Sequence, residues 1–184
     1  MKKLLCIALS FVILLSFAAC KNEDKTSSES GIDLEYYADS GKIPECDYAL
    51  GTDVEKVKQE LSDYAESEEG AESLYDVIEG DENSYITNGN YNFYYKNDNE
   101  EDGISYIVSF GKAYGFETGE IILNVKEALS GIEYTEEEIN DDNAFFLFVP
   151  IEGSVIKCEF EKNTIMFVFE NNALCATAIY NNDF

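Results

Sequence analysis

The sequence predicts an α+β protein of two tandem units, each a helix or helix pair packed on an antiparallel meander sheet of three to four strands. Each half contains one apolar stripe at helical spacing, followed by short runs in which apolar and polar residues alternate. The sequences of the two halves also align weakly with each other. The expected units span residues 46–116 and 117–184.

The first nineteen residues have the layout of a secretory signal peptide. Two lysines precede an apolar run from Leu4 to Phe17, which is shorter than the roughly 20 residues of a membrane-spanning helix. The run ends in Phe17-Ala18-Ala19-Cys20. This ending resembles the lipobox of bacterial lipoproteins, although Phe17 stands where Leu is usual. The resemblance implies that Cys20 becomes the N-terminus and carries lipid, including palmitate. An ordinary signal peptide with a chance cysteine is the alternative.

Composition excludes several function classes. The chain has 38 Asp and Glu against 12 Lys, with no Arg, His or Trp, and its net charge of −26 becomes −28 when Lys2 and Lys3 leave with the signal. The electrostatic field of so negative a chain repels nucleic acid and anionic lipid headgroups. The expected membrane contact is therefore the lipid on Cys20. Catalysis that needs histidine is excluded. Carboxylate, Tyr, Lys or Cys chemistry remains, and no cofactor is expected.

Residues 20–45 are expected to be the lipidated cysteine and a flexible tether, because their first part lacks the apolar content to fold. Contact of Tyr36 and Tyr37 with the folded part is the alternative, which leaves the boundary of the domain open. The first unit then begins with a helix. Thr52 to Glu55 fits a capping box, and the apolar stripe that follows contains Val54, Val57, Leu61 and Tyr64. A second, weaker helix is expected over 71–79, with Gly80 as its stop.

The strands of the first unit come next and are indicated by the alternation of apolar and polar residues. We expect strands over 84–87 and 104–110, with Asn88-Gly89 as a hairpin turn. Between them, Tyr91, Phe93 and Tyr95 alternate with more polar residues and are expected to face the first helix.

The second unit repeats this order. Its helix is expected over 118–129 and ends at Ser130-Gly131. Thr135 to Glu138 is another capping-box pattern and predicts a short second helix. Strands are expected over 144–149, 155–160, 164–170 and 174–180.

Three cysteines remain in the mature chain, namely Cys46, Cys158 and Cys175, so at most one disulfide could form. Tight turns at 162–163 and 171–172 would set Cys158 opposite Phe167 and Cys175 opposite Val168. The two thiols would then point to different faces of the sheet, and Cys158 is expected in the core.

A resemblance to a known fold rests on two short openings, Leu50-Gly51-Thr52-Asp53-Val54 and Thr118-Gly119-Glu120-Ile121-Ile122. They are similar to the starts of the units in the beta-lactamase inhibitor protein fold and its relatives among small outer-membrane lipoproteins. The chain also looks like uncharacterised lipoproteins of Gram-positive anaerobes. The resemblance covers residues 47–184 and implies a binding or assembly scaffold. No catalytic or inhibitory residue is carried over, since no matching motif is present.

Two groups of residues are candidate sites. Asp98, Glu100 and Asp102 before Gly103 resemble the first half of a calcium loop, but Ser109 stands where the twelfth position needs Glu. A solvated hairpin loop is the alternative. The tyrosine-rich strand is the better candidate for recognition, with Tyr94 as the expected exposed aromatic.

The favoured function is a non-enzymatic, lipid-anchored module on the extracytoplasmic face of the cell membrane, where it binds a protein or a wall component. Its acidic surface suits a basic partner. Two alternatives stay open. One is an enzyme or small-ligand binder that uses carboxylates and tyrosine in the groove between the units, and the other is a purely structural envelope protein.

Overall fold

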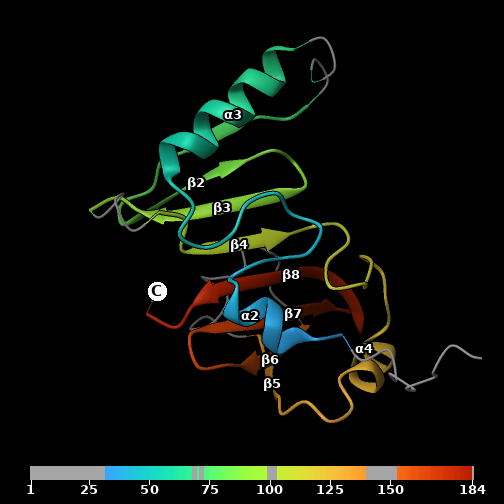
Figure 1. The fold of residues 1–184 in the computed structure, drawn as a ribbon. Helices are drawn as coiled ribbons and strands as arrows, with labels where there is room; N and C mark the ends of the chain where they lie inside the picture. The colour runs from blue at the N-terminus through green and yellow to red at the C-terminus, as the bar shows by residue number, and fades with distance from the viewer. Residues whose placement is uncertain (1–31, 68–69, 71–72, 99–102, 140–152, 184) are drawn as a thin grey trace, which may run out of the picture. The chain divides into compact units, whose positions relative to one another are not determined.

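The computed structural model describes residues 32–67, 70, 73–98, 103–139 and 153–183. In this part, eight strands form one antiparallel sheet in the order β1-β2-β3-β4-β8-β7-β6-β5, accompanied by three helices (Figure 1). The helices are α2 (Leu34–Asp39), α3 (Val54–Glu66) and α4 (Ile122–Ala128); the strands are β1 (Asp76–Ile78), β2 (Asn83–Thr87), β3 (Tyr91–Lys96), β4 (Tyr106–Ser109), β5 (Thr135–Glu138), β6 (Gly153–Glu159), β7 (Asn163–Glu170) and β8 (Ala173–Asn181). The α+β class is confirmed.

The central pairing of the sheet joins β4 to β8. The register sets Tyr106 opposite Tyr180 and Ser109 opposite Thr177. Every other neighbouring pair connects strands that are consecutive in the chain. The β4–β8 pair therefore joins the four strands before residue 110 and the four strands from residue 135 onward into one sheet.

Helix α3 confirms the predicted first helix, and Val54, Val57 and Leu61 are buried as its stripe requires. Tyr64, the fourth residue of the expected stripe, is 49% exposed because it lies in the last turn of the helix. The predicted cap is wrong by one residue. Asp53 is the N-cap and accepts a hydrogen bond from the Lys56 amide at 2.7 Å. Thr52 instead donates its hydroxyl to the Ala49 carbonyl at 2.7 Å and shapes the turn before the helix.

Helix α2 lies inside the segment expected to be a tether. Leu34, Ala38 and Ile43 are at most 1% exposed and belong to the main core cluster. The Asn163 side-chain amide of β7 donates to the Ala38 carbonyl at 2.6 Å. The folded part of the chain thus includes residues from Ile32 onward, and the expected tether is wrong for residues 32–45.

Two predicted helices are strands. Residues 76–78 of the expected helix over 71–79 form β1, which pairs with β2. Thr135 to Glu138, expected as a capped helix, form β5, which pairs with β6. Both are the terminal strands of the sheet. The expected strand over 144–149 lies outside the described residues.

The turns confirm the hairpins but shift some registers. In the β2–β3 turn the Asn88 amide donates to the Tyr91 carbonyl at 3.2 Å, so Gly89 and Asn90 are the central residues. Asn171 and Asn172 do form the β7–β8 turn, both with positive φ. The β6–β7 turn is centred one residue earlier than expected. Cys158 therefore lies opposite Ile165 and not opposite Phe167.

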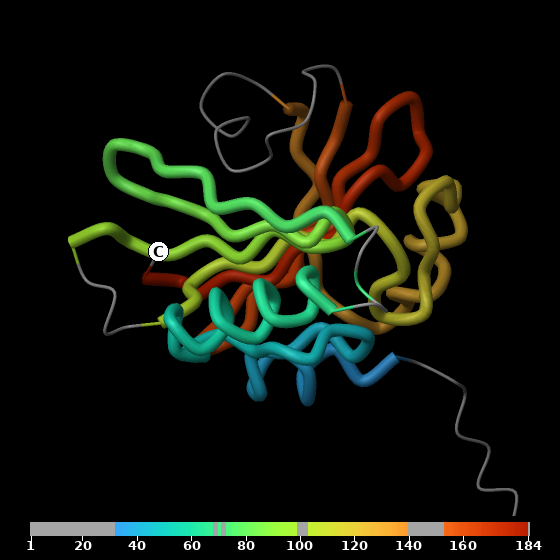
Figure 2. The backbone as a smooth tube through the Cα atoms, turned by 90° about the horizontal axis from the view of Figure 1, so that it is seen from above, coloured from blue at the N-terminus to red at the C-terminus, as the bar shows by residue number. Residues whose placement is uncertain are grey.

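The inner strands of the sheet are buried on both faces, whereas β5 is exposed along its whole length. Helices α2 and α3 lie on one face (Figure 2), where their apolar residues join a cluster with Ile86, Phe93 and Phe167. On the opposite face a second cluster contains Tyr94, Tyr106 and Met166. Helix α4 adds Ile122 and Val125 to the first cluster. None of the helices described here is long and apolar enough to cross a membrane.

The burial of α2 predicts a stability difference within one helix. Leu34→Ala should lower the free energy of unfolding by about 2–5 kcal/mol because it opens a cavity in the core. Tyr36→Ala, on the exposed side of α2, should change it by no more than about 0.5 kcal/mol. Urea denaturation of the mature chain from Lys21 measures both. Equal effects would contradict the packing of α2.

Candidate functional site

Four tyrosines form a row across the sheet face opposite the helices. Tyr85, Tyr94, Tyr106 and Tyr180 are cross-strand neighbours on β2, β3, β4 and β8. Successive ring centroids lie 4.9, 5.3 and 5.5 Å apart, distances at which aromatic rings attract one another. This row is part of the second core cluster, so its contacts stabilise the sheet.

The expected exposure of Tyr94 is therefore wrong. Its side chain is 2% exposed, and its hydroxyl accepts a hydrogen bond from the Asn92 amide at 3.2 Å. Burial raises the pKa of Tyr94 well above the usual value for tyrosine. The expected orientation of the neighbouring row is confirmed, because Phe93 and Tyr95 lie in the core cluster beneath the helices and Tyr91 packs against it.

The other sequence-predicted sites remain predictions. Asp98 is exposed in the turn after β3, while Glu100, Asp102 and Cys20 lie outside the described residues. In the described part of the chain, no three Cys, Asp or Glu side chains come together in a way that could hold a metal ion.

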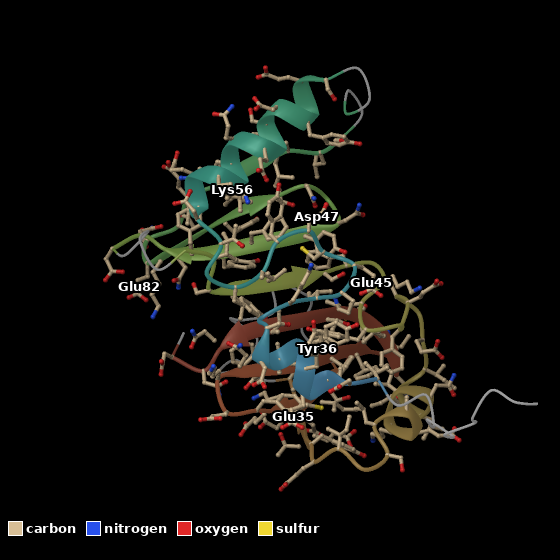
Figure 3. The ribbon with its side chains drawn as sticks, in the orientation of Figure 1. Glu35, Tyr36, Glu45, Asp47, Lys56 and Glu82 are labelled. Carbon is tan, nitrogen blue, oxygen red and sulfur yellow. The ribbon has the colours of Figure 1, made fainter. Side chains whose placement is uncertain are left out.

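A pocket of about 280 Å³ lies where α3, the loop over 45–48 and the β2–β3 hairpin meet. We call it the acid–tyrosine pocket. Carboxylates and tyrosines dominate its lining, with smaller contributions from apolar and amide groups. The lining residues are Glu45, Cys46, Asp47, Tyr48, Glu60, Leu61, Tyr64, Asn88, Tyr91 and Phe93. Figure 3 shows Glu45 and Asp47 on the loop that crosses the sheet between α2 and α3.

Hydrogen bonds and ring contacts hold the 45–48 loop in place. The Tyr91 hydroxyl donates to the Glu45 carbonyl at 3.0 Å. The Glu45 carboxylate accepts from the backbone amides of Tyr114 and Gly115 at 3.1 and 3.3 Å. The Tyr48 ring meets Phe93 edge to face at 5.3 Å. The loop is thus fixed both to β3 and to the turn after β4, which makes the pocket a preformed one.

The electrostatics of the pocket are negative. Asp47 and Glu60 are both exposed at its rim, and Glu60 also pairs with the ammonium group of Lys56 at 3.9 Å. The three carboxylates of Glu45, Asp47 and Glu60 still outnumber this one cation. Burial, followed by the interaction of its hydroxyl with the Glu60 carboxylate, raises the pKa of Tyr48 to about 12. Burial raises the pKa of the Cys46 thiol to about 11. Cys46 is therefore a neutral thiol at neutral pH and lacks the thiolate that a nucleophile needs. The pocket is suited to hold a cation.

A larger polar groove of about 620 Å³ lies at the end of the sheet where β4 begins and β8 ends. Its charged lining residues have both signs, namely Asp39, Glu161, Asp183, Lys96 and Lys162. Its asparagines bind the backbone: the Asn182 amide donates to the Phe160 carbonyl at 2.9 Å. These bonds connect β8 to the β6–β7 turn, which indicates a structural role.

Sequence reasoning missed the acid–tyrosine pocket. Glu60 and Tyr64 lie one helical turn apart on α3, and this spacing placed them on one side of the helix. This helical spacing could have been recognised in the sequence. The approach of the 45–48 loop and of Asn88 to the helix could not, since it depends on how the chain folds over β3.

Comparisons with known proteins add no relative. No protein family matches the chain, and no curated protein or solved structure matches it. The resemblance to the beta-lactamase inhibitor protein fold and to bacterial lipoproteins therefore stays a prediction.

The buried thiols predict a pH dependence of stability. Burial raises the pKa of Cys46 and Cys158 from 9.0 to about 11. The folded state holds these protons more tightly than the unfolded state, so the stabilisation is complete below about pH 9 and is lost as the pH rises to about 11. Each thiol contributes at most about 3 kcal/mol to the free energy of unfolding.

Urea unfolding at pH 8, 9, 10 and 11 measures this loss. Cys158→Ala lowers stability at every pH but should flatten the decline above pH 9, because one titrating group is removed. Parallel curves for the wild-type chain and Cys158→Ala would contradict the assignment.

Proposed function

We propose that the chain is exported, lipidated on Cys20 and held at the extracytoplasmic face of the cell membrane, where the folded domain binds a basic protein or wall component without catalysing a reaction. The observation that carries this proposal is the acid–tyrosine pocket on a chain with 38 Asp and Glu and 12 Lys. An acidic surface of this kind attracts basic partners and speeds their encounter.

The exposure of the carboxylates supports binding over catalysis. Asp47 and Glu60 at the pocket, and Asp39, Glu161 and Asp183 at the polar groove, are all exposed. General acids and bases among carboxylates are usually tuned by burial. The polar groove nonetheless favours a second candidate function, the binding of a small polar ligand, because lysines and carboxylates, which carry charges of both signs, line one volume of about 620 Å³.

We also propose that the domain consists of two tandem units, 46–116 and 117–184. The strand order supports this. In each set of four strands, β1 to β4 and β5 to β8, the first strand lies at an edge of the sheet and the last lies at the central β4–β8 pair. Helices α3 and α4 precede the two sets of strands in the chain. The weak match between residues 50–61 and 118–129 points the same way.

The anchor has a direct test. Cys20→Ala should move the protein from the membrane fraction to the soluble fraction, because the acidic domain has no affinity of its own for anionic headgroups. Cys6→Ala, inside the expected signal peptide, is the matched control and should remain in the membrane fraction. Continued incorporation of labelled palmitate into Cys20→Ala would contradict the anchor.

The partner class is tested with the mature chain from Lys21 immobilised as bait in envelope extract. Proteins retained at low salt should be more basic than the extract as a whole and should elute as salt screens the charges. The most abundant retained protein, once purified, should bind saturably with an affinity that falls with salt. Retained proteins that are no more basic than the extract, together with no binding to isolated wall material, would overturn the proposed function.

A further inference from the structure

The acid–tyrosine pocket combines two features that select a particular kind of ligand group. Asp47 and Glu60 place carboxylates at the rim, while Tyr48, Tyr64 and Tyr91 supply aromatic walls. Glu60 also pairs with Lys56 at 3.9 Å, but this pair is exposed and an exposed pair is weak, so an incoming cation can compete for the carboxylate. Carboxylates bind cations by charge, and aromatic rings bind them by their negative faces. Long basic side chains also carry an apolar stem that packs well against rings.

We propose that this pocket receives the side chain of a lysine or arginine from a basic segment of a partner protein. The cationic group lies at Asp47 and Glu60, and the methylene stem lies against the tyrosines. This inference rests on the proposed function and deepens it, because it assigns the basic partner to one place on the domain.

The same chemistry occurs within the fold. The Lys58 ammonium lies 4.9 Å from the centroid of the Tyr95 ring and 2.8 Å from the Glu55 carboxylate. A lysine held by one tyrosine and one glutamate is therefore already present on α3. The acid–tyrosine pocket offers a larger version of this arrangement to a side chain from outside.

Exposed apolar surface adjoins the pocket. Tyr64 is 49% exposed and Leu74 is 64% exposed. The Leu74 side chain lies against Gly89 of the β2–β3 turn, so close that a Cβ atom added to Gly89 would lie 3.3 Å from the Leu74 Cβ. Asn88 of the same turn lines the pocket. Exposed large apolar side chains beside charged groups are typical of interaction sites. They give the partner segment a surface on which to rest.

The loop that carries Asp47 needs no rearrangement to bind. Its neighbour Glu45 is fixed through its carbonyl by Tyr91 and through its carboxylate by two backbone amides. A preformed loop does not lose conformational freedom when the ligand enters. The negative potential inside the pocket also contributes to the raised pKa of Tyr48, so a bound cation should lower that pKa.

The test uses the mature chain from Lys21 and a hexapeptide of alternating glycine and lysine, acetylated at its N-terminus and amidated at its C-terminus. Nitrogen-15 NMR follows the titration at 0.15 M salt. Shift changes should concentrate on the amides of Asp47, Tyr48, Glu60 and Tyr64. The same peptide with every lysine acetylated should not bind, because it keeps the stem and loses the charge.

Matched charge variants separate the pocket from the general field of the protein. Glu60→Gln and Asp47→Asn should each weaken binding about threefold to fivefold, as expected for an ion pair near the surface. Glu79→Gln and Glu127→Gln remove the same charge from exposed positions outside the pocket. They should change affinity less than about 1.5-fold, because salt screens charges beyond about 8 Å.

Tyr64 tests the aromatic wall. Tyr64→Ala should weaken binding about fivefold, and Tyr64→Phe should keep most of the affinity because it retains the ring. Equal melting temperatures show that these exposed substitutions leave the fold intact.

Equal weakening by all four charge variants would overturn the pocket, as would peptide binding that ignores lysine acetylation. So would selective binding of the domain to isolated wall material with no binding of the peptide. These results leave the proposed function standing if envelope extract still yields a basic partner. If the peptide binds at the pocket but the domain binds neither a basic protein from the extract nor wall material, the proposed function would be overturned instead.

Discussion

The pairing of β4 with β8 is the constraint on which the rest of the structure depends. It joins two sets of strands that are otherwise connected only to their neighbours in the chain. The segment containing α2 and the 45–48 loop packs across this junction, with Ala38 bonded to β7 on one side and Glu45 bonded to β3 on the other. The loop in turn forms one wall of the acid–tyrosine pocket. The position of the pocket is therefore a consequence of the joined sheet.

The distribution of reactive groups supports the proposed binding function. Tyr94 and Tyr106 are buried in the row across the sheet, and burial raises the pKa of both hydroxyls far above the usual range. Burial likewise keeps Cys46 and Cys158 as neutral thiols at neutral pH. The groups that remain at the surface in quantity are carboxylates, which attract cations at long range. This acidic surface supports the proposed binding of a basic partner.

Much of the fold could be predicted, and the errors have physical reasons. Helix α3 and the strands β2, β3, β7 and β8 were found because a buried stripe or a half-buried face leaves a periodic pattern. The terminal strands β1 and β5 were mistaken for helices, since Leu74, Val77 and Ile78 have helical spacing and Thr135 to Glu138 fits a capping box. Pairing with β2 and β6 overrides those local preferences.

The site residues were harder to predict than the strands. Tyr94 was expected at the surface because the alternation of apolar and polar residues shows which face of the sheet a residue joins but not whether that face is covered. The acid–tyrosine pocket combines residues near positions 46, 62 and 90, and only the tertiary fold brings them together.

Native-state hydrogen exchange tests the joined sheet most directly. Strands β4 and β8 lie at its centre, so their amides should exchange only through global unfolding, with the same free energy as that from urea denaturation. Amides of β1 and β5 at the two ends should exchange through smaller openings. Strands β1 to β4 and β5 to β8 should not open as independent units. Separate opening of the two sets, with fast exchange in β4 and β8, would contradict the account.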